Sequence, residues 1–159
     1  MCTPMKKIIN EIGGGFKEPI KALQIGGPLG GVVPIKEVEK LNLDFQEFTA
    51  AGFMLGHASI VSIPKDFSMV EYIHHLFEFS AEESCGKCFP GRLGSYRGKE
   101  MFDQAVNKSK KIPLKLLNEL LITMKKGSLC ALCGAIPVPI MNILKYFSDE
   151  MKSDIVQEN

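Results

Sequence analysis

The chain of 159 residues is 45% hydrophobic and 23% charged, which suits one globular domain or two small ones. Its 19 basic and 18 acidic residues leave a net charge of +1, so no overall field attracts nucleic acid or an anionic membrane surface. No apolar run approaches the roughly 18 residues that span a bilayer, and the N-terminus lacks the apolar segment of a secretory signal. We therefore expect a cytoplasmic protein with no nucleic-acid partner and no direct membrane insertion.

The first third of the chain predicts short elements separated by glycines. Residues 5–12 have isoleucines at helical spacing, with Thr3 as N-cap and Pro4 at the first helical position. Residues 20–25 predict a strand, and the glycine-rich residues 26–31 predict a tight loop after it. This loop lacks the spacing and the lysine of a phosphate-binding loop, which favours a structural turn.

Two further elements are expected before residue 64. A short helix is predicted over residues 44–51, with Phe45 and Phe48 facing inward, and a second strand over residues 59–63. His57 lies alone among glycines, and His74 and His75 follow one another, so they point about 100° apart on a helix. We expect these three histidines to be structural or exposed rather than metal ligands.

From about Ser68, which is placed as an N-cap, the sequence predicts helices only. The first covers residues 69–80 and the second residues 92–106, where Gly94 and Gly98 each cost up to about 1 kcal/mol relative to alanine. A third helix opens at Pro113, ends at Gly127 and has an apolar stripe formed by Leu114, Leu117, Leu121 and Met124.

Pro137 and Pro139 predict a rigid extended link into the last helix. The buried face of that helix is predicted from its apolar spacing as Ile140, Ile143, Leu144, Phe147 and Met151. Four amphipathic segments joined by short loops indicate a small helical bundle, with a boundary near residues 64–68. The sequence therefore predicts an α+β chain.

Four of the five cysteines form two Cys-x-x-Cys pairs, Cys85 with Cys88 and Cys130 with Cys133. In a reducing compartment this arrangement indicates metal ligation or redox chemistry rather than disulfides, and Cys2 is expected to be an incidental thiol. Thiolate sulfur selects iron–sulfur clusters, zinc or copper(I), and the spacing alone leaves zinc and iron–sulfur open.

The two cysteine pairs lie where a closed helical bundle can bring them together. The first pair follows the first helix of the bundle, and the second precedes the last. Both loops can then meet at one end, where Lys87 and Arg92 would offset the negative charge of an iron–sulfur centre. A thioredoxin-type redox motif is not expected, because neither pair follows a strand in a βαβ unit.

Several segments occur in the order and spacing of one family: Gln24-Ile-Gly-Gly-Pro-Leu-Gly-Gly31, Ala50-Ala-Gly-Phe-Met-Leu-Gly56, Glu82-Glu-Ser-Cys-Gly-Lys-Cys-Phe-Pro90, Ser128-Leu-Cys130 and Leu144-Lys-Tyr-Phe147. With them the chain resembles the C-terminal part of the NADH-binding flavoprotein subunit of respiratory complex I. The same region is shared with the corresponding subunits of NAD-linked hydrogenases and formate dehydrogenases.

The resemblance implies a partial β-grasp-like domain of the soluble-ligand-binding type over residues 1–66 and a helical iron–sulfur-binding domain over residues 67–159. It also implies a [4Fe–4S] cluster that receives electrons from flavin mononucleotide (FMN) reduced by NADH. The FMN and NADH sites are expected on a missing domain or a partner, and other subunits of a multisubunit oxidoreductase are the expected partners.

The chain departs from the family pattern in two places. The family pattern Cys-x-x-Cys-x-x-Cys would place its third cysteine at Gly91, so Cys85, Cys88 and Cys130 match family ligands and Gly91 does not. Cys133 is additional and is predicted to supply the fourth thiolate. We expect the strands that precede the first helix of the β-grasp-like domain to be missing, and an incomplete sheet edge invites a partner strand or self-association.

Two functions follow from these observations. The first is an electron-transfer module of an NADH-linked oxidoreductase, with a quinone or another acceptor, that holds one cluster on Cys85, Cys88, Cys130 and Cys133 and has no catalytic residue of its own. The alternative is a degenerate structural or assembly module of such a complex, either metal-free or tied by zinc on the same cysteines.

Overall fold

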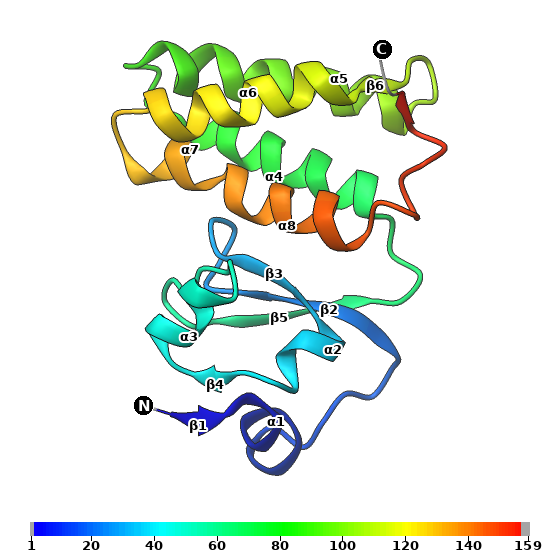
Figure 1. Ribbon diagram of the computed structural model, residues 1–159. Coiled ribbons are helices and arrows are strands. Elements are labelled where there is room, and N and C mark those ends of the chain that lie inside the picture. The colour runs from blue at the N-terminus through cyan, green and yellow to red at the C-terminus, as the bar shows by residue number, and fades with distance from the viewer. Residues whose placement is uncertain (1, 157–159) are drawn as a thin grey trace. The chain divides into compact units, whose positions relative to one another are not determined.

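The computed structural model describes residues 2–156, and it confirms the α+β prediction. Contacts between residues divide the chain into two compact units, one up to Phe67 and one from Ser68 onward. The first unit contains a small sheet with short helices, and the second is built mainly from helices (Figure 1). Each unit is described by itself below.

The first unit is organised around a three-stranded antiparallel sheet in the order β3–β2–β5. The predicted first strand is confirmed at its bounds, and the second is shifted by one residue: the strands are β2 (Ile20–Ile25), β3 (Gly31–Pro34) and β5 (Ile60–Pro64). Ala22, Leu23 and Ile25 of the central strand are fully buried, because both neighbours pair with it along most of its length.

The glycine-rich loop between β2 and β3 is a structural turn, as predicted. The side-chain amide of Gln24 donates hydrogen bonds to the carbonyl oxygens of Gly27 (2.7 Å) and Gly30 (3.1 Å). A Cβ at Gly30 would lie 1.9 Å from the carbonyl oxygen of Ile25, so no larger residue fits without moving the backbone. The buried Gln24 side chain thus ties the loop to β2, the strand that precedes it.

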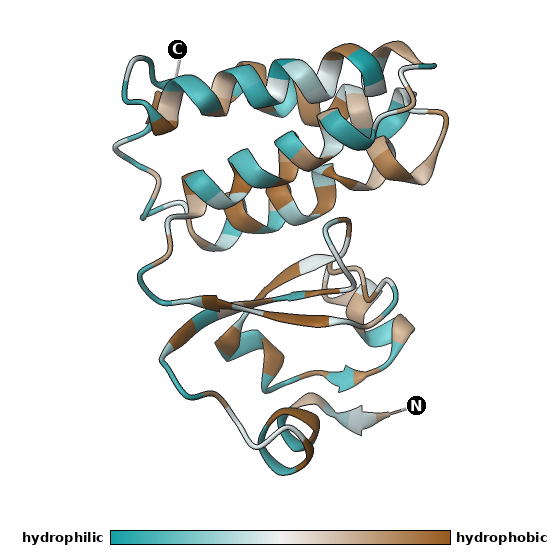
Figure 2. Cartoon of the chain, turned by 180° about the vertical axis from the view of Figure 1, so that it is seen from behind, coloured by the Kyte–Doolittle hydropathy of each residue, from teal (hydrophilic) through white to brown (hydrophobic). Residues whose placement is uncertain are grey.

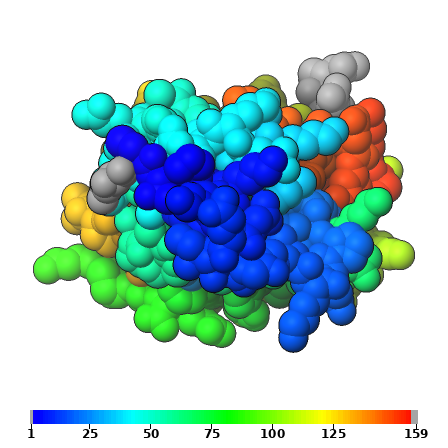
Figure 3. All heavy atoms as spheres, turned by 90° about the horizontal axis from the view of Figure 1, so that it is seen from below, coloured from blue at the N-terminus to red at the C-terminus, as the bar shows by residue number. Residues whose placement is uncertain are grey.

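Short elements surround this sheet: β1 (Thr3–Pro4), α1 (Met5–Lys7), the π-helical turn η1 (Ile8–Ile12), α2 (Ile35–Val38), β4 (Asn42–Leu43) and α3 (Phe45–Ala50). β1 pairs antiparallel with β4, and Figure 3 shows the dark blue N-terminal segment beside the cyan segment of the chain that includes β4. The helix predicted over residues 5–12 is therefore present as α1 and η1.

Three sequence predictions for this unit are wrong. Thr3 is not the N-cap and Pro4 is not the first helical residue, because both pair in β1; Pro4 takes the N-cap position, and α1 begins at Met5 with no side-chain cap. Phe45 is 52% exposed, whereas Phe48 is fully buried as predicted. The two residues share a face of α3, but Phe45 lies at the helix end, directly after the N-cap Asp44, whereas Phe48 lies one turn further into the helix.

The second unit contains the four predicted amphipathic helices and a short additional one. Their bounds are α4 (Met69–Glu83), α5 (Ser95–Val106), α6 (Leu114–Gly127), α7 (Ala131–Ala135) and α8 (Pro137–Tyr146), with the π-helical turn η2 (Pro90–Gly94) before α5. Each helical ribbon alternates between hydrophobic and hydrophilic stretches in Figure 2, as expected for helices that bury one face.

The predicted extended link at Pro137 and Pro139 is wrong, because both prolines belong to the first turn of α8. Backbone N–H groups in the first turn of a helix have no intrahelical acceptor, so proline loses nothing there, and its fixed φ suits the helix. The predicted buried face is confirmed at Ile140 and Ile143, which are fully buried. Leu144 is only half-buried, and the helix ends at Tyr146, so the half-buried Phe147 and the fully buried Met151 lie beyond it.

The core between α4 and α5 depends on the close approach of the two helices. Phe77 on α4 and Phe102 on α5 are fully buried, with ring centroids 5.7 Å apart. Gly98 lies directly against the Phe77 ring: a Cβ at this position would be 2.1 Å from Cε1. The glycine that weakens α5 locally therefore makes room for an aromatic side chain of its neighbour.

A hydrogen bond links the beginning of the helical unit to its last residues, and a small sheet links the residues just before α6 to the same region. The backbone N–H of Met69 donates to the Glu150 carboxylate (2.9 Å), and Ser68 caps α4 as predicted by accepting from the N–H of Glu71. β6 (Ile112–Pro113) pairs in parallel with β7 (Ile155–Val156).

None of the helices within residues 2–156 is both long enough and apolar enough to cross a membrane.

Candidate metal centre

Both Cys-x-x-Cys pairs belong to the helical unit: Cys85 and Cys88 lie between α4 and η2, whereas Cys130 is the N-cap of α7 and Cys133 lies within that helix. Cys85 is exposed in the turn that follows α4, where Gly86 adopts a positive φ of 70°. The backbone N–H of Gly86 donates to the Ser84 hydroxyl (3.3 Å), which stabilises this turn. Cys88 is half-buried and lies just before the π-helical turn η2.

Gly91 is the buried residue around which this turn is built. Its carbonyl oxygen accepts a hydrogen bond from the buried Ser95 hydroxyl (2.6 Å), and the next backbone N–H, of Arg92, donates to the Cys88 carbonyl oxygen (2.9 Å). π-helical turns are frequent at functional sites because they re-aim the residues around them. Here the turn sets Gly91 directly beside the sulfur of Cys88.

Two cysteine sulfurs border the space next to Gly91. A Cβ placed on Gly91 would lie 3.0 Å from the Sγ of Cys88 and 3.1 Å from the Sγ of Cys133. These two cysteines come from different pairs and are 45 residues apart in the chain. The structure therefore brings one member of each pair to the same point.

The surroundings of Cys88 favour its thiolate form. Backbone N–H groups of Leu129 and Gly91 donate toward its sulfur and lower the pKa of the thiol, with a smaller contribution from the Ser128 hydroxyl. The Ser128 Oγ atom is buried and makes no hydrogen bond with the described part of the chain. N–H and O–H donors aimed at a sulfur are the interactions that stabilise ligating thiolates and set cluster potentials.

Cys133 occupies a different environment, because it is only 2% exposed. Burial raises the pKa of its thiol, while hydrogen bonds with Ser84 and Ser80 act in the opposite direction. The sulfur lies 3.8 Å from the Ser84 hydroxyl and 3.9 Å from the Ser80 hydroxyl of α4. The two hydroxyls at the C-terminal end of α4 therefore hold the buried Cys133 thiol in one position.

Cys130 is the N-cap residue of α7 and is exposed. The N–H of Gly134 donates to its carbonyl oxygen (3.2 Å), which closes the first turn of α7 and brings Cys133 onto the same side as Cys130. Cys130 and Cys88 both lie close enough to Cys133 for their charges to raise its pKa, after the larger effect of burial.

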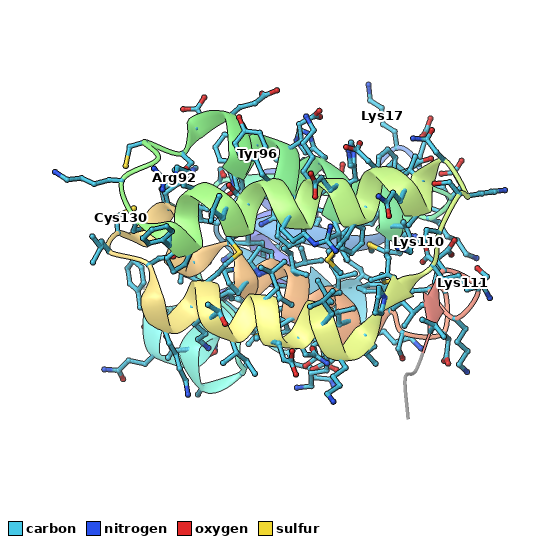
Figure 4. All side chains as sticks on the ribbon, turned by 90° about the horizontal axis from the view of Figure 1, so that it is seen from above. Lys17, Arg92, Tyr96, Lys110, Lys111 and Cys130 are labelled. Carbon is cyan, nitrogen blue, oxygen red and sulfur yellow. The ribbon has the colours of Figure 1, made fainter. Side chains whose placement is uncertain are left out.

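Arg92 and Cys130 lie at one end of the helical unit, and Lys110 and Lys111 lie at the opposite end (Figure 4). The Arg92 side chain lies against Gly86, since a Cβ there would be 3.7 Å from Cδ, and its guanidinium stacks over Phe89, 5.2 Å from the ring centroid. Arg92 therefore lies against the turn that contains Cys85, and both Arg92 and Lys87 are exposed.

Within residues 2–156, no three histidine, cysteine or acidic side chains converge closely enough to hold a single metal ion. His74 does not contribute to the site, because its Nε2 is 2.6 Å from the Asp103 carboxylate on α5. The donor set at the cysteine end is sulfur, surrounded by N–H and hydroxyl donors, and this chemistry fits an iron–sulfur cluster.

The sequence predictions did not include three serines that contact the cysteine sulfurs: Ser80, Ser84 and Ser128. A local signal exists for two of them, because Ser84 directly precedes Cys85 and Ser128 is two residues before Cys130. No neighbouring cysteine in the sequence points to Ser80, because Ser80 meets Cys133 only where α4 packs against α7.

These features are those of a thiolate-based metal-binding domain. Comparison with known proteins identifies the family: the profile described as "NADH-ubiquinone oxidoreductase-F iron-sulfur binding region" matches residues 71–154, which is more than half of the chain. The chain therefore belongs to the family defined by this iron–sulfur-binding region of NADH-ubiquinone oxidoreductases. The resemblance inferred from the sequence is confirmed.

Individual relatives extend this match beyond the helical unit. The chain is 30% identical over 158 residues to the NADP-reducing hydrogenase subunit HndC of Solidesulfovibrio fructosivorans, covering 98% of this chain and 32% of that protein. It is 27% identical over 168 residues to the mitochondrial NADH-ubiquinone oxidoreductase 51 kDa subunit of Neurospora crassa, covering 100% of this chain and 34% of the relative. The chain thus spans about a third of the length of each of these proteins.

The fold also occurs in a solved structure. A crystal structure of an NAD+-reducing [NiFe]-hydrogenase in the H2-reduced state contains a chain that matches with a TM-score of 0.80 and 19% sequence identity. The match covers 95% of this chain and 26% of that one. The fold is therefore shared with a region of a larger protein.

Proposed function

We propose that this chain is an electron-transfer module of an NADH-linked oxidoreductase and that its helical unit holds one [4Fe–4S] cluster. The main support is that the matched iron–sulfur region contains both cysteine pairs, and that one member of each pair lies beside Gly91. No residue of the chain is proposed to perform bond chemistry.

The residues at the cysteine end have distinct parts in this function. Cys85, Cys88 and Cys130 are proposed as cluster ligands, and the fourth ligand is considered separately below. When bound, the cluster supplies a site that accepts and releases one electron at a time. The N–H groups of Leu129 and Gly91 stabilise negative charge on the Cys88 sulfur, and the Arg92 guanidinium adds a positive charge close to the same loop.

The remaining parts of the NADH reaction are assigned to other chains or domains. The chain spans only about a third of its relatives, so we propose that FMN and NADH bind to a separate domain or a partner chain. Residues 1–66 are proposed to form a partial β-grasp-like domain, and residues 67–159 the iron–sulfur-binding domain. Self-association at a sheet edge and a cytoplasmic location stay predictions.

Anaerobic reconstitution of the full chain with iron and sulfide tests the proposal. About four irons and four sulfides per chain, with an electron paramagnetic resonance (EPR) signal on reduction by dithionite, are expected. Cys2→Ser, which removes a thiol outside the helical unit, is the matched control and should not change iron content. Stoichiometric zinc in the isolated protein, with no iron uptake, would instead support the structural alternative.

A further inference from the structure

The surroundings of Gly91 indicate which residue could supply the fourth ligand. Cys85 and Cys88 continue at the same spacing to residue 91, which has no side chain. A Cβ built there would point between the sulfurs of Cys88 and Cys133, at 3.0 and 3.1 Å. The sulfur of Cys133 therefore lies in the space that a side chain at position 91 would enter.

Cys133 is held in that space by its own surroundings. The first turn of α7 brings it back toward Cys130, and the hydroxyls of Ser84 and Ser80 fix its sulfur from the side of α4. Ser84 also anchors the turn that contains Cys85, through the N–H of Gly86. The same hydroxyl thus links the buried thiol to the first cysteine pair.

The absence of a side chain at position 91 is what permits this arrangement. Any Cβ at that position would lie 3.1 Å from the Sγ of Cys133, which is closer than an ordinary van der Waals contact and requires that sulfur to move. Residues 91 and 133 therefore compete for one space, and only one of them can place a sulfur there without displacing the other.

We propose that Cys133 is the fourth cluster ligand and that it replaces a thiolate from position 91, so that the ligand has moved from the turn η2 to α7. The inference rests on the proposed function, because it assumes that the helical unit holds a cluster. It predicts that the two positions are interchangeable: a cysteine at 91 should substitute for the one at 133.

Reciprocal substitution tests this exchange. Cys133→Ala should lower the iron bound by the reconstituted chain and change or abolish the EPR signal of the reduced protein. Adding Gly91→Cys to Cys133→Ala should restore iron content and signal to the wild-type level. The matched control, Gly91→Ser with Cys133→Ala, has nearly the same volume but offers a hydroxyl, and should not restore them.

The readouts separate failure of this inference from failure of the proposed function. If the wild-type chain binds no iron, both are overturned. If the wild-type chain binds a cluster and Cys133→Ala binds the same amount with an unchanged spectrum, only the role of Cys133 is overturned. Equal recovery by the serine and cysteine variants would also overturn it, because packing alone would then explain the effect.

Folding of each variant is checked by far-UV circular dichroism before reconstitution. If the Gly91→Cys double variant does not fold, Cys133→Ser decides the question, since it changes only sulfur to oxygen at a buried position. A folded Cys133→Ser protein with wild-type iron content contradicts the proposal, and a folded protein with reduced iron content supports it.

Discussion

Replacing Gly98 with alanine should destabilise the helical unit, although alanine is the better helix former. The added Cβ would lie 2.1 Å from Cε1 and 2.2 Å from Cδ1 of the Phe77 ring. That ring is fully buried and packs against Phe102, so it has no free space to enter. The Gly98→Ala variant must therefore separate α4 from α5 or force Phe77 out of its rotamer.

The magnitude follows from two opposing terms. Overpacking of a core costs about 1 to 3 kcal/mol, and the depth of this overlap favours the upper end. Against this, alanine stabilises a helix by about 1 kcal/mol relative to glycine. The free energy of unfolding should fall by about 2 kcal/mol, which corresponds to a decrease of roughly 8 to 16 °C in melting temperature for a unit of this size.

Urea unfolding of the metal-free protein, followed by circular dichroism at 222 nm, measures this change. Gly94→Ala is the matched control in the adjoining turn η2, because its Cβ would meet the flexible side chain of Met124 at 2.9 Å rather than a ring. It should stay within about 1 kcal/mol of wild type. The reasoning is refuted if Gly98→Ala unfolds at the same or a higher urea concentration than wild type.

A double-mutant cycle identifies the contact responsible. Phe77→Leu removes the Cε1 and Cζ atoms that the new methyl group would meet and leaves two δ-methyl groups that can rotate away from it, so Gly98→Ala should cost less in that background. A coupling of at least about 1 kcal/mol between the two substitutions is expected. Additive effects would show that the loss arises elsewhere than at the Phe77 ring.

Three further predictions concern a cap and two titrating groups. Asp44→Ala removes the side chain that accepts from the N–H of Gln46 (2.8 Å), so stability should fall by about 1 kcal/mol in urea unfolding, whereas Asp44→Asn should retain most of it. Ser128→Ala removes a hydroxyl near the Cys88 sulfur and should raise the pKa of that thiol. The pH dependence of alkylation, in a chain whose only cysteine is Cys88, measures this pKa. An unchanged pKa would show that the Ser128 hydroxyl does not stabilise the thiolate. Burial raises the pKa of Tyr72 from 10.0 to about 12, and because the unfolded chain ionises first, stability should fall as the pH rises from 10 toward 12. Tyr72→Phe should reduce this fall, and identical pH profiles for the two proteins would exclude Tyr72 as its source.

Elements with strong local signals were predictable from the sequence. β2 has the predicted bounds, and α3 and α4 begin directly after Asp44 and Ser68, whose side chains accept hydrogen bonds from backbone N–H groups in the first turn of each helix. The glycine-rich turn was predictable as structural, because it lacks the residues of a phosphate site. These features depend on a few consecutive residues.

Features that depend on tertiary packing were not predictable in the same way. Pro137 and Pro139 suggest an extended link from local preference, yet the first turn of α8 accommodates both. The meeting of Cys88 and Cys133 requires the π-helical turn at Gly91 and the additional helix α7, neither of which has a distinct sequence pattern. Cysteine spacing indicated a metal centre but could not show which sulfurs would be neighbours.

The connection between the two ends of the helical unit has a consequence for how such a unit can be rearranged among proteins. Met69, at the start of α4, donates its N–H to Glu150, and Ile112 pairs with Ile155. These interactions join residues that are far apart in sequence but belong to the same unit. The start of α4 and the last residues of the unit are therefore held together by atoms of the unit itself. Domains whose two ends lie close together are tolerated when they are inserted into other chains or fused to them, and this hydrogen bond brings the start and the end of the helical unit together.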